Sequence, residues 1–377
     1  MKKVIFGTAL ASMALLSACS SDNELANVGT TASNAIGFHV VGNKAETRAN
    51  IINTTEDLKK TDFNVFAYKN NDGTDGEIFM GDKENDDNNL YGVRIKYETN
   101  KWVYNDPSEL RYWPTTALNF YAVNPGSTTS FSWNFTNQKK QITYACSDEY
   151  VKNSKGEYYN NPNIDAMYAV TKNQTQTNND GFVKFNFKHI LSQVVFQAKT
   201  QYANMEVEIK ALSIHNFYFG GTFTIPEGEP SQKDWAPTTI SYQPKGFTAV
   251  MDESIKVAKT DEVTNISTQG PMLFIPQKLT EWDLKDNIDA TTTAKQSYLK
   301  ITCKIKQSGA YLFGGDTTFD ELYVPFGADW QPGKRYIYTI IFGGGYNAQG
   351  QAILQPINFK AEVGKWEDTD ATINVNK

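Results

Sequence analysis

Three cysteines and three histidines are the side chains of this sequence best suited to covalent or metal chemistry. They are Cys19, Cys146, Cys303, His39, His189 and His215. No histidine lies within five positions of another histidine or of a cysteine, so the spacing of a metal site is missing. Cys146 could in principle pair with His189 or His215 as an activated nucleophile, but nothing in the sequence positions them together. We therefore predict no catalytic residue, no bound metal and no cofactor.

Other patterns that carry chemistry are weak. The sequence has no Gly-x-Ser-x-Gly, no His-Glu-x-x-His and no phosphate-binding Gly-x-x-x-x-Gly-Lys motif. The acidic stretch from Asp72 to Asp87 offers oxygen atoms of the kind that Ca²⁺ prefers, but it departs from the EF-hand spacing at Gly73. A solvated loop is the favoured interpretation of this stretch.

Cys19 differs from the other two cysteines because of what precedes it. Lys2 and Lys3 are followed by the apolar segment 4–16 and by the small residues Ser17 and Ala18, which is typical of a secretory signal peptide. The segment is shorter than the roughly 20 apolar residues that a membrane-spanning helix needs. Leu-Ser-Ala-Cys resembles the lipobox of bacterial lipoproteins, in which the thiol receives a diacylglycerol and becomes the first mature residue. The alternative is an ordinary signal peptide with an incidental cysteine.

Composition limits the remaining possibilities. The chain has 377 residues, a formal net charge of -6 and a hydrophobic share of 40%, so it is long enough for two domains and has no excess of basic residues. Binding to nucleic acid is therefore not expected. If Cys19 is lipidated, Cys146 and Cys303 allow at most one disulfide, and we predict that both are free thiols in or near the core.

Apolar residues recur with a period of two along most of the chain, which is typical of half-buried β-strands. Examples are 36–40, 63–67, 93–97, 118–122, 131–135, 183–187, 194–198, 207–209, 299–305, 336–342 and 357–361. Only residues 54–60 favour a helix, with a threonine cap and acidic residues in the first turn. The fold class predicted from this pattern is all-β, with antiparallel sandwiches.

The polar segment 171–181 carries almost no apolar side chain and is the best candidate for a domain boundary. It would separate residues 49–181 from residues 182–377, each long enough for a β-sandwich. Residues 70–89 and 146–163 are predicted to be long polar loops.

Two Trp residues stand beside prolines at the entrance of predicted strands, Trp113 before Pro114 and Trp330 near Pro332. We expect each indole to cover the end of a hydrophobic core. A platform on which a glycan stacks is the functional alternative.

The ordered set of motifs resembles the fimbrillins of the type V pilus. The resemblance rests on the lipobox at Cys19, on Glu-Thr-Arg-Ala at 46–49, on Phe-Asn-Val-Phe-Ala-Tyr at 63–68, on Arg-Tyr-Trp-Pro at 111–114 with Leu-Asn-Phe-Tyr-Ala at 118–122, on residues 187–194, on Trp-Gln-Pro-Gly-Lys-Arg-Tyr-Ile-Tyr at 330–338 and on Val-Gly-Lys-Trp at 363–366. Each motif is weak alone, but together they span nearly the whole chain in the family's order.

This resemblance implies two transthyretin-like antiparallel β-sandwich domains and assembly by donor-strand exchange. In such pilins an Arg-specific protease cuts the lipidated precursor, and the matching bond lies between Arg48 and Ala49. Residues 1–18 would be the lipoprotein signal peptide, and residues 19–48 the lipidated tether and propeptide with the first strand. The first strand, which cleavage would remove, contains Ile36, Phe38 and Val40. The alternative is that Arg48 is an ordinary loop residue.

The strand that replaces the first one is expected from the C-terminal region of a subunit. The sequence offers three alternating stretches, 351–354, 357–361 and 371–375, and the candidate donor residues are Ile353, Ile357, Phe359, Ile373 and Val375.

The resemblance thus implies a non-enzymatic pilus subunit at the cell surface, first anchored in the outer membrane by lipid and then part of a fimbrium that supports adhesion. Its partners would be other pilus subunits, an Arg-specific protease and the outer membrane. A surface lipoprotein or tip adhesin that binds a glycan or a host molecule is the alternative.

Overall fold

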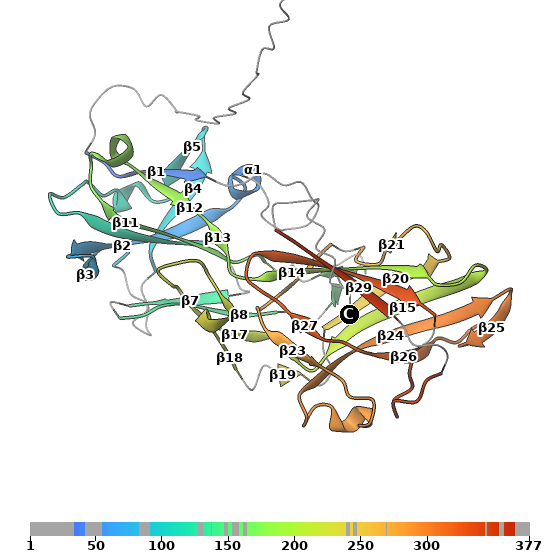
Figure 1. Ribbon diagram of the computed structural model, residues 1–377. Helices are drawn as coiled ribbons and strands as arrows, with labels where there is room; N and C mark the ends of the chain where they lie inside the picture. Colours follow the sequence, from blue (N-terminus) through green and yellow to red (C-terminus); the bar gives the residue numbers. More distant parts are fainter. Residues whose placement is uncertain are drawn as a thin grey trace, which may run out of the picture. The chain divides into compact units, whose positions relative to one another are not determined.

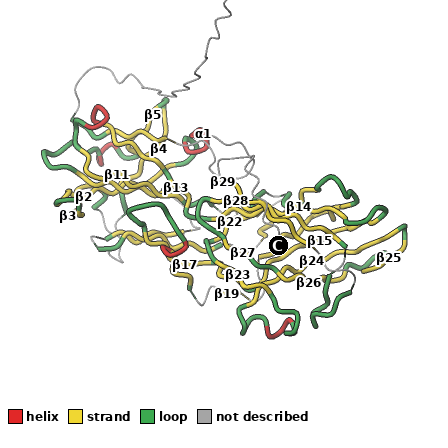
Figure 2. Tube along the Cα trace, viewed as in Figure 1, coloured by secondary structure: helices red, strands yellow, loops and turns green. Residues whose placement is uncertain are grey.

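In the residues that its structure, a computed structural model, describes, the regular secondary structure is almost entirely β-strand (Figures 1 and 2). These residues are 34–41, 55–82, 91–126, 131–136, 138–146, 150–152, 158–160, 164–238, 242–243, 247–268, 270–343, 345–353 and 358–365. Within them the single α-helix is α1 (Thr55–Leu58), as expected from its acidic first turn, and no helix is long and apolar enough to cross a membrane. Short 3-10 helices are η1 (Pro107–Glu109), η2 (Asn178–Gly181), η3 (Gln232–Asp234) and η5 (Ile288–Ala290). The all-β prediction is confirmed.

The largest sheet of the N-terminal part has the strand order β13-β11-β6-β2-β4-β5, with β3 also paired to β2. Its strands are β2 (Asp62–Asn71), β3 (Thr74–Met80), β4 (Val93–Glu98), β5 (Lys101–Tyr104), β6 (Leu118–Asn124), β11 (Met167–Gln174) and β13 (Lys188–His189). Every residue of β6 is buried, because β2 and β11 pair with its two edges and side chains pack on both of its faces. This sheet positions the first strand of the chain.

Two short strands, β1 (Gly37–Val41) and β12 (Phe182–Asn186), form a separate parallel pair. Their inward side chains share one hydrophobic cluster with the large sheet, which we call the N-terminal core. It consists of Ile36, Phe38, Phe63, Val65, Ala67, Met80, Val93, Ile95, Trp113, Leu118, Phe120, Ala122, Ala169, Val183 and Phe185. The first strand is thus part of the core and not of a tether.

A four-stranded sheet contains strands from both halves of the sequence. Its order is β18-β17-β8-β7, and its strands are β7 (Phe131–Phe135), β8 (Lys140–Ala145), β17 (Gly220–Thr224) and β18 (Trp235–Pro237). The pairing of β8 with β17 therefore crosses residue 181, and so does the pairing of β1 with β12. The division into domains of residues 49–181 and 182–377 stays a prediction. Under this division, both pairings join strands from the two sides of the boundary.

The C-terminal part holds two larger sheets. One has the order β21-β14-β28-β29, with β22 also on β14; the other has the order β20-β15-β24-β23-β27, with β25 and β26 also on β24. The first contains β14 (Ser192–Thr200), β21 (Thr264–Asn265), β22 (Met272–Phe274), β28 (Lys334–Phe342) and β29 (Asn358–Lys365). The second contains β15 (Met205–His215), β20 (Phe247–Val257), β23 (Lys278–Glu281), β24 (Gln296–Gln307), β25 (Ala310–Phe313), β26 (Asp320–Pro325) and β27 (Ala328–Asp329). Two further pairs are β16 (Phe217–Tyr218) with β19 (Tyr242–Gln243), and β9 (Tyr150–Lys152) with β10 (Tyr158–Asn160).

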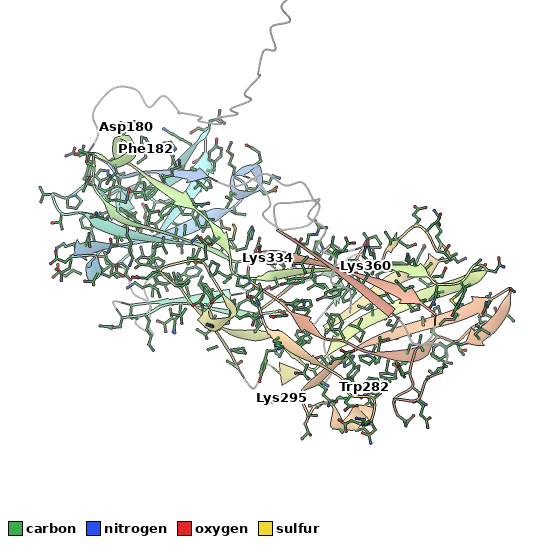
Figure 3. All side chains as sticks on the ribbon, in the orientation of Figure 1. Asp180, Phe182, Trp282, Lys295, Lys334 and Lys360 are labelled. Atoms are coloured by element: carbon green, nitrogen blue, oxygen red, sulfur yellow. The ribbon has the colours of Figure 1, made fainter. Side chains whose placement is uncertain are left out.

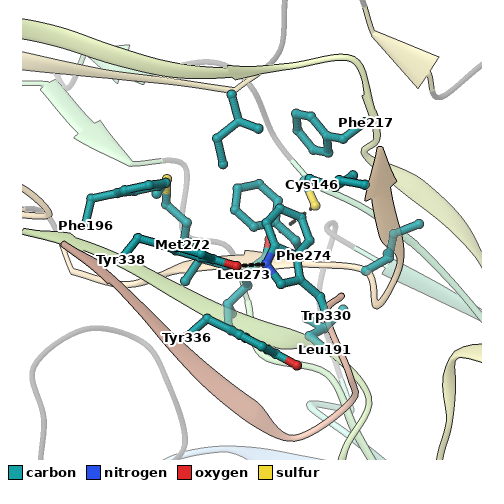
Figure 4. Packing of buried hydrophobic residues seen from close by; sticks show 14 of the residues in the cluster. Cys146, Leu191, Phe196, Phe217, Met272, Leu273, Phe274, Trp330, Tyr336 and Tyr338 are labelled. Carbon is teal, nitrogen blue, oxygen red and sulfur yellow. Dashed lines mark hydrogen bonds between the residues drawn. The ribbon is translucent and has the colours of Figure 1, made fainter. Parts of the chain in front are cut away.

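Aromatic side chains dominate the core between these sheets, as the close view in Figure 4 shows. The indole of Trp330 stacks on Phe274 with ring centroids 5.0 Å apart, and its Nε1–H donates a hydrogen bond to the Tyr338 hydroxyl at 3.0 Å. The Phe196 ring stacks on the Tyr338 ring, with centroids 5.5 Å apart. A buried indole N–H needs such an acceptor, so the hydrogen bond fixes where Trp330 can sit.

The loop predictions were wrong in part. Residues 74–80, expected in a loop, form strand β3, which follows a two-residue turn at Asp72 (φ 48°) and Gly73 (φ 88°). Two successive residues with positive φ fit the tight hairpin turn that an Asp-Gly pair favours. The expected loop 146–163 likewise contains the paired strands β9 and β10, and β11 extends into the polar segment as far as Gln174. Backbone pairing does not require alternating apolar side chains, so the sequence pattern missed these strands.

Strand direction was also only partly as expected. Most pairs are antiparallel, but β1–β12, β14–β28 and β23–β24 are parallel. Parallel partners need a long connection between them, and period-two patterning carries no information on direction.

Candidate functional site

The first strand lies between two other segments of the N-terminal part. On one side β1 pairs with β12 along its whole length, from Gly37 opposite Phe182 to Val41 opposite Asn186. Just before β1 the backbone pairs with residues 111–113: the Ile36 N–H donates to the Arg111 carbonyl at 2.9 Å, and the Trp113 N–H donates to the Asn34 carbonyl at 2.8 Å. Within the described residues β12 has no strand partner other than β1. Loss of the first strand would therefore leave β12 without a strand partner there.

The inward side chains of this strand fill the N-terminal core. Ile36 and Phe38 are only 1% and 3% exposed, and Val40 is half-buried against the N-terminal core. The Phe38 ring lies parallel to that of Phe185, with centroids 5.9 Å apart, and meets the ring of Phe63 edge-on at 6.4 Å. We call the space that these three inward side chains occupy the first-strand groove.

A hydroxyl group also holds the strand. The Tyr104 hydroxyl donates a hydrogen bond to the Ile36 carbonyl at 3.0 Å, and burial raises the pKa of this phenol, which keeps it a donor. Tyr104 also contacts the Phe38 ring at 5.7 Å. The first strand is thus bound by backbone pairing, by apolar burial and by a side-chain hydrogen bond.

The outward side of the strand has one titratable group, His39. Its ring lies 4.3 Å from the Phe182 ring, and in the register of the pair it stands opposite Lys184. Burial, and in second place the positive charge of Lys184, lower the pKa of His39 below its usual value of 6.5. The strand therefore binds best when this imidazole is neutral.

This shift predicts that acid loosens the first strand. Because the folded-state pKa is lowered, the stability that neutral His39 contributes is complete above about pH 6.5 and is lost as the pH falls through the folded-state pKa. We expect exchange of the β1 backbone amides, corrected for intrinsic rates, to accelerate between about pH 7.5 and pH 5.5 by local opening. In the His39→Gln variant this acceleration should be smaller. Equal acceleration in both proteins would contradict the assignment.

Several predicted site residues lie outside the described residues: Cys19, Arg48, Ala49, Ile357, Ile373 and Val375. Lipidation and cleavage therefore stay predictions. Of the candidate donor residues, Phe359 belongs to the backbone of β29, which pairs antiparallel with β28, and the Ile353 N–H donates to the Gly345 carbonyl at 2.8 Å. Ile353 also packs against the large hydrophobic cluster that contains Phe274, Trp330 and Tyr338.

The two Trp residues are core residues, as the simpler interpretation predicted. Trp330 is completely buried, and Trp113 is 7% exposed and donates its Nε1–H to the Gly181 carbonyl at 2.9 Å. Neither indole face is open to solvent, so the glycan-platform interpretation is wrong for both. Among the described residues the exposed aromatic residues are instead Tyr91, Tyr112 and Tyr202, and the sequence gave no signal of their exposure.

Within the part of the chain that the structure describes, the cysteines and histidines do not assemble into a reactive group. Cys146 and Cys303 are buried free thiols, as predicted, and burial raises the pKa of Cys146 to about 12. A reactive thiol needs a lowered pKa, so Cys146 is poorly suited to nucleophilic chemistry. His189 lies 2.9 Å from Asp165, and His215 lies 2.8 Å from the Ser213 hydroxyl.

The sequence pattern favoured a solvated loop for the acidic stretch after Asp72. In the structure, however, one of its carboxylates, that of Asp75, is partly buried and hydrogen-bonded. The Asp75 carboxylate accepts hydrogen bonds from the Tyr121 hydroxyl at 2.7 Å and from Asn119 at 2.9 Å, and it pairs with Lys140 at 3.0 Å. Burial alone would raise the pKa of Asp75, but these donors outweigh it and the pKa is lowered. Since Asp75 lies in β3 and Lys140 in β8, this ion pair joins two sheets. Within the described residues no cluster of three metal-ligating side chains occurs.

Fold and site together define an all-β protein of several, mostly antiparallel, sheets whose first strand completes a hydrophobic core. Comparison with protein families matches residues 47–366 to the fimbrillin-like family, and the chain belongs to that family. As a member of this non-enzymatic family, the protein is not an enzyme. Comparison with curated protein sequences gave no match.

Solved structures that match this chain include proteins from two Bacteroides species. A fimbrial protein from Bacteroides vulgatus has 16% sequence identity and a TM-score of 0.56, and the alignment covers 88% of this chain and 99% of that chain. A candidate cell adhesion protein from Bacteroides ovatus has 13% identity and a TM-score of 0.46, with 89% and 98% covered. At this identity the first similarity establishes the fold alone.

Proposed function

We propose that this chain is a structural subunit of a cell-surface pilus, or fimbria, that is exported as a lipoprotein and supports adhesion. Membership of the fimbrillin-like family supports the proposal, and so does a fold shared with a protein described as fimbrial. Its architecture would be two transthyretin-like β-sandwiches. Lipid on Cys19 would hold the precursor at the outer membrane, and the mature subunit would join the fimbrium.

Assembly would begin with a cut by an Arg-specific protease between Arg48 and Ala49. The observation that carries this proposal is the burial of the first strand: residues 34–41 complete the N-terminal core, yet they precede the predicted cut. The family match begins at residue 47, beside Arg48. Cleavage would thus separate a core strand from the rest of its own domain.

The vacated groove would bind a strand from another subunit. Burial of an apolar side chain contributes about 1.5–3 kcal/mol, so the positions of Ile36, Phe38 and Val40 offer a large driving force for a replacement. An unpaired β12 adds backbone hydrogen bonds to any incoming strand. The candidate donor lies near the C-terminus. Ile357 and Phe359 are separated by one polar residue, as are Ile373 and Val375, and Ile353 lies just before the first pair. Within the described residues β29, which contains Phe359, lies at the edge of its sheet and pairs with one strand, β28.

Determination of the mature N-terminus tests the proposal. Mass spectrometry of the protein extracted from the cell surface should find Ala49 as the first residue, together with oligomers that resist dissociation. Arg48→Ala should keep the lipidated Cys19 and the first strand on the protein and abolish these oligomers.

A neighbouring basic residue supplies the control. Lys44→Ala changes a positive charge in the same segment and should leave both processing and assembly as in the wild type. An intact lipidated Cys19 in wild-type material that contains only monomers would overturn the proposal.

A further inference from the structure

Gly37 stands directly opposite Phe182 in the parallel pair of β1 and β12, and Figure 3 labels Phe182 among the side chains of β12. A Cβ atom at position 37 would lie 2.5 Å from two carbon atoms of the Phe182 ring and 3.3 Å from a third. Carbon atoms in favourable contact are about 3.5–4.0 Å apart. Gly37 is not among the glycines with positive φ, so space and not backbone conformation requires glycine here.

The Phe182 ring cannot move aside without loss. It packs against the His39 ring at 4.3 Å, and His39 is the next outward residue of the same strand. A larger residue at position 37 would push the ring away from His39 and expose more of its apolar surface. A strand that binds in this groove therefore needs a small residue on its outward face, opposite Phe182, and apolar residues on its inward face.

We propose that Phe182 is a specificity-determining residue that selects which strand binds in the first-strand groove. This inference rests on the strand exchange proposed above and names the partner: an extended segment of another polypeptide with the pattern apolar-Gly-apolar-any-apolar, in the register of residues 36–40. The apolar positions fill the N-terminal core, and the glycine lies under the Phe182 ring.

Two candidate donor stretches of this chain, 357–361 and 371–375, do not fit this pattern. Aligned by its apolar residues, Ile357-Asn358-Phe359-Lys360-Ala361 matches residues 36–40 but puts Asn358 in the place of Gly37. It also puts Lys360 in the place of His39, opposite Lys184. The stretch 371–375 offers only Thr372 or Asn374 at the glycine position. The groove therefore selects against these C-terminal stretches of a second copy of this chain, and its preferred partner is a different subunit whose donor strand carries the glycine.

The steric contact is tested in the intact full chain. Gly37→Ala should increase the opening of β1, measured by amide exchange, by about tenfold, whereas Gly37→Ala combined with Phe182→Ala should return it to the rate of Phe182→Ala alone. The matched control is Gly228→Ala, because a Cβ at Gly228 has no atom within 4 Å and should change nothing. Independent effects of the two substitutions at positions 37 and 182 would overturn the contact.

Selection of a partner is tested on the full protein after cleavage at Arg48, with two labelled synthetic peptides of residues 34–42. The native peptide should replace the cut strand and bind about tenfold more tightly than the same peptide with Gly37→Ala, and the two should bind equally to the Phe182→Ala protein. Equal binding to the wild-type protein would overturn the inference but leave strand exchange intact. Failure of both peptides to bind would overturn strand exchange and the partner inference together.

Discussion

Replacement of Phe38 by alanine is expected to lower the free energy of unfolding by about 3–5 kcal/mol. The side chain is 3% exposed and lies among the rings of Phe63, Tyr104 and Phe185, which cannot collapse easily around a smaller residue. Urea denaturation followed by fluorescence would measure the loss. Phe38→Leu, which conserves most of the volume, should cost less than about 1.5 kcal/mol.

Tyr112→Ala is the matched control for this effect. Tyr112 stands next to the first strand, where its backbone pairs with Ala35, but the residue is 57% exposed. Removal of this ring should change stability by about 0.5 kcal/mol or less. If Phe38→Ala costs as little as Tyr112→Ala, the first strand does not fill the core and the basis for strand exchange disappears.

The consequence for assembly follows from the same contacts. A strand whose central residue contributes several kcal/mol does not leave quickly after a cut in the connecting segment. We therefore expect the cut strand to stay bound until another strand competes for the groove, by mass action. In the cleaved protein, Phe38→Ala should accelerate replacement by a labelled peptide.

Trp330→Ala is the second substitution with a large expected effect, again about 3–5 kcal/mol. Trp330 is completely buried, stacks on Phe274 and donates its indole N–H to the Tyr338 hydroxyl. Removal leaves a cavity between aromatic side chains and takes a hydrogen-bond donor from Tyr338. Thermal unfolding should show a clear decrease in the midpoint temperature, and far-UV circular dichroism would reveal any loss of strand content.

A conservative variant separates packing from ligand binding. Trp330→Phe keeps an aromatic ring but loses the N–H, so it should cost much less than alanine. If Trp330 were instead a glycan platform, its alanine variant would lose binding on a glycan array and keep its stability. Tyr112 is exposed in the wild-type protein, so Tyr112→Ala serves on the same array as the control for loss of a surface aromatic side chain.

Much of the fold was predictable because it depends on local patterns. Alternation in 63–67, 118–122 and 299–305 predicted strands, and these segments are β2, β6 and β24. Only β24 alternates between buried and partly exposed residues there, whereas 63–67 and 118–122 are buried on both faces. The short helix at residues 55–58 has its acidic first turn where the pattern requires it. The burial of Cys146 and Cys303 was also expected, since two cysteines without a ligand spacing behave as small apolar residues.

The parts that could not be predicted depend on pairing between distant residues. Polar strand β3 gains its place from the backbone of β2 and from the Asp75–Lys140 pair, and neither leaves a periodic signal. The pairing of β8 with β17 joins residues about 80 positions apart. Nothing in the local sequence says which of many similar strands becomes the neighbour.

The sequence by itself determined the class of this protein, an all-β fimbrillin-like chain, and it determined which residues of the first strand face inward, because period-two alternation fixes the two faces of a strand. Only the tertiary structure decided that this strand runs parallel to β12, that Gly37 lies under the Phe182 ring and that His39 stands opposite Lys184. The physical reason is that these features depend on register between segments more than 140 residues apart, and register is set by the packing of the whole core.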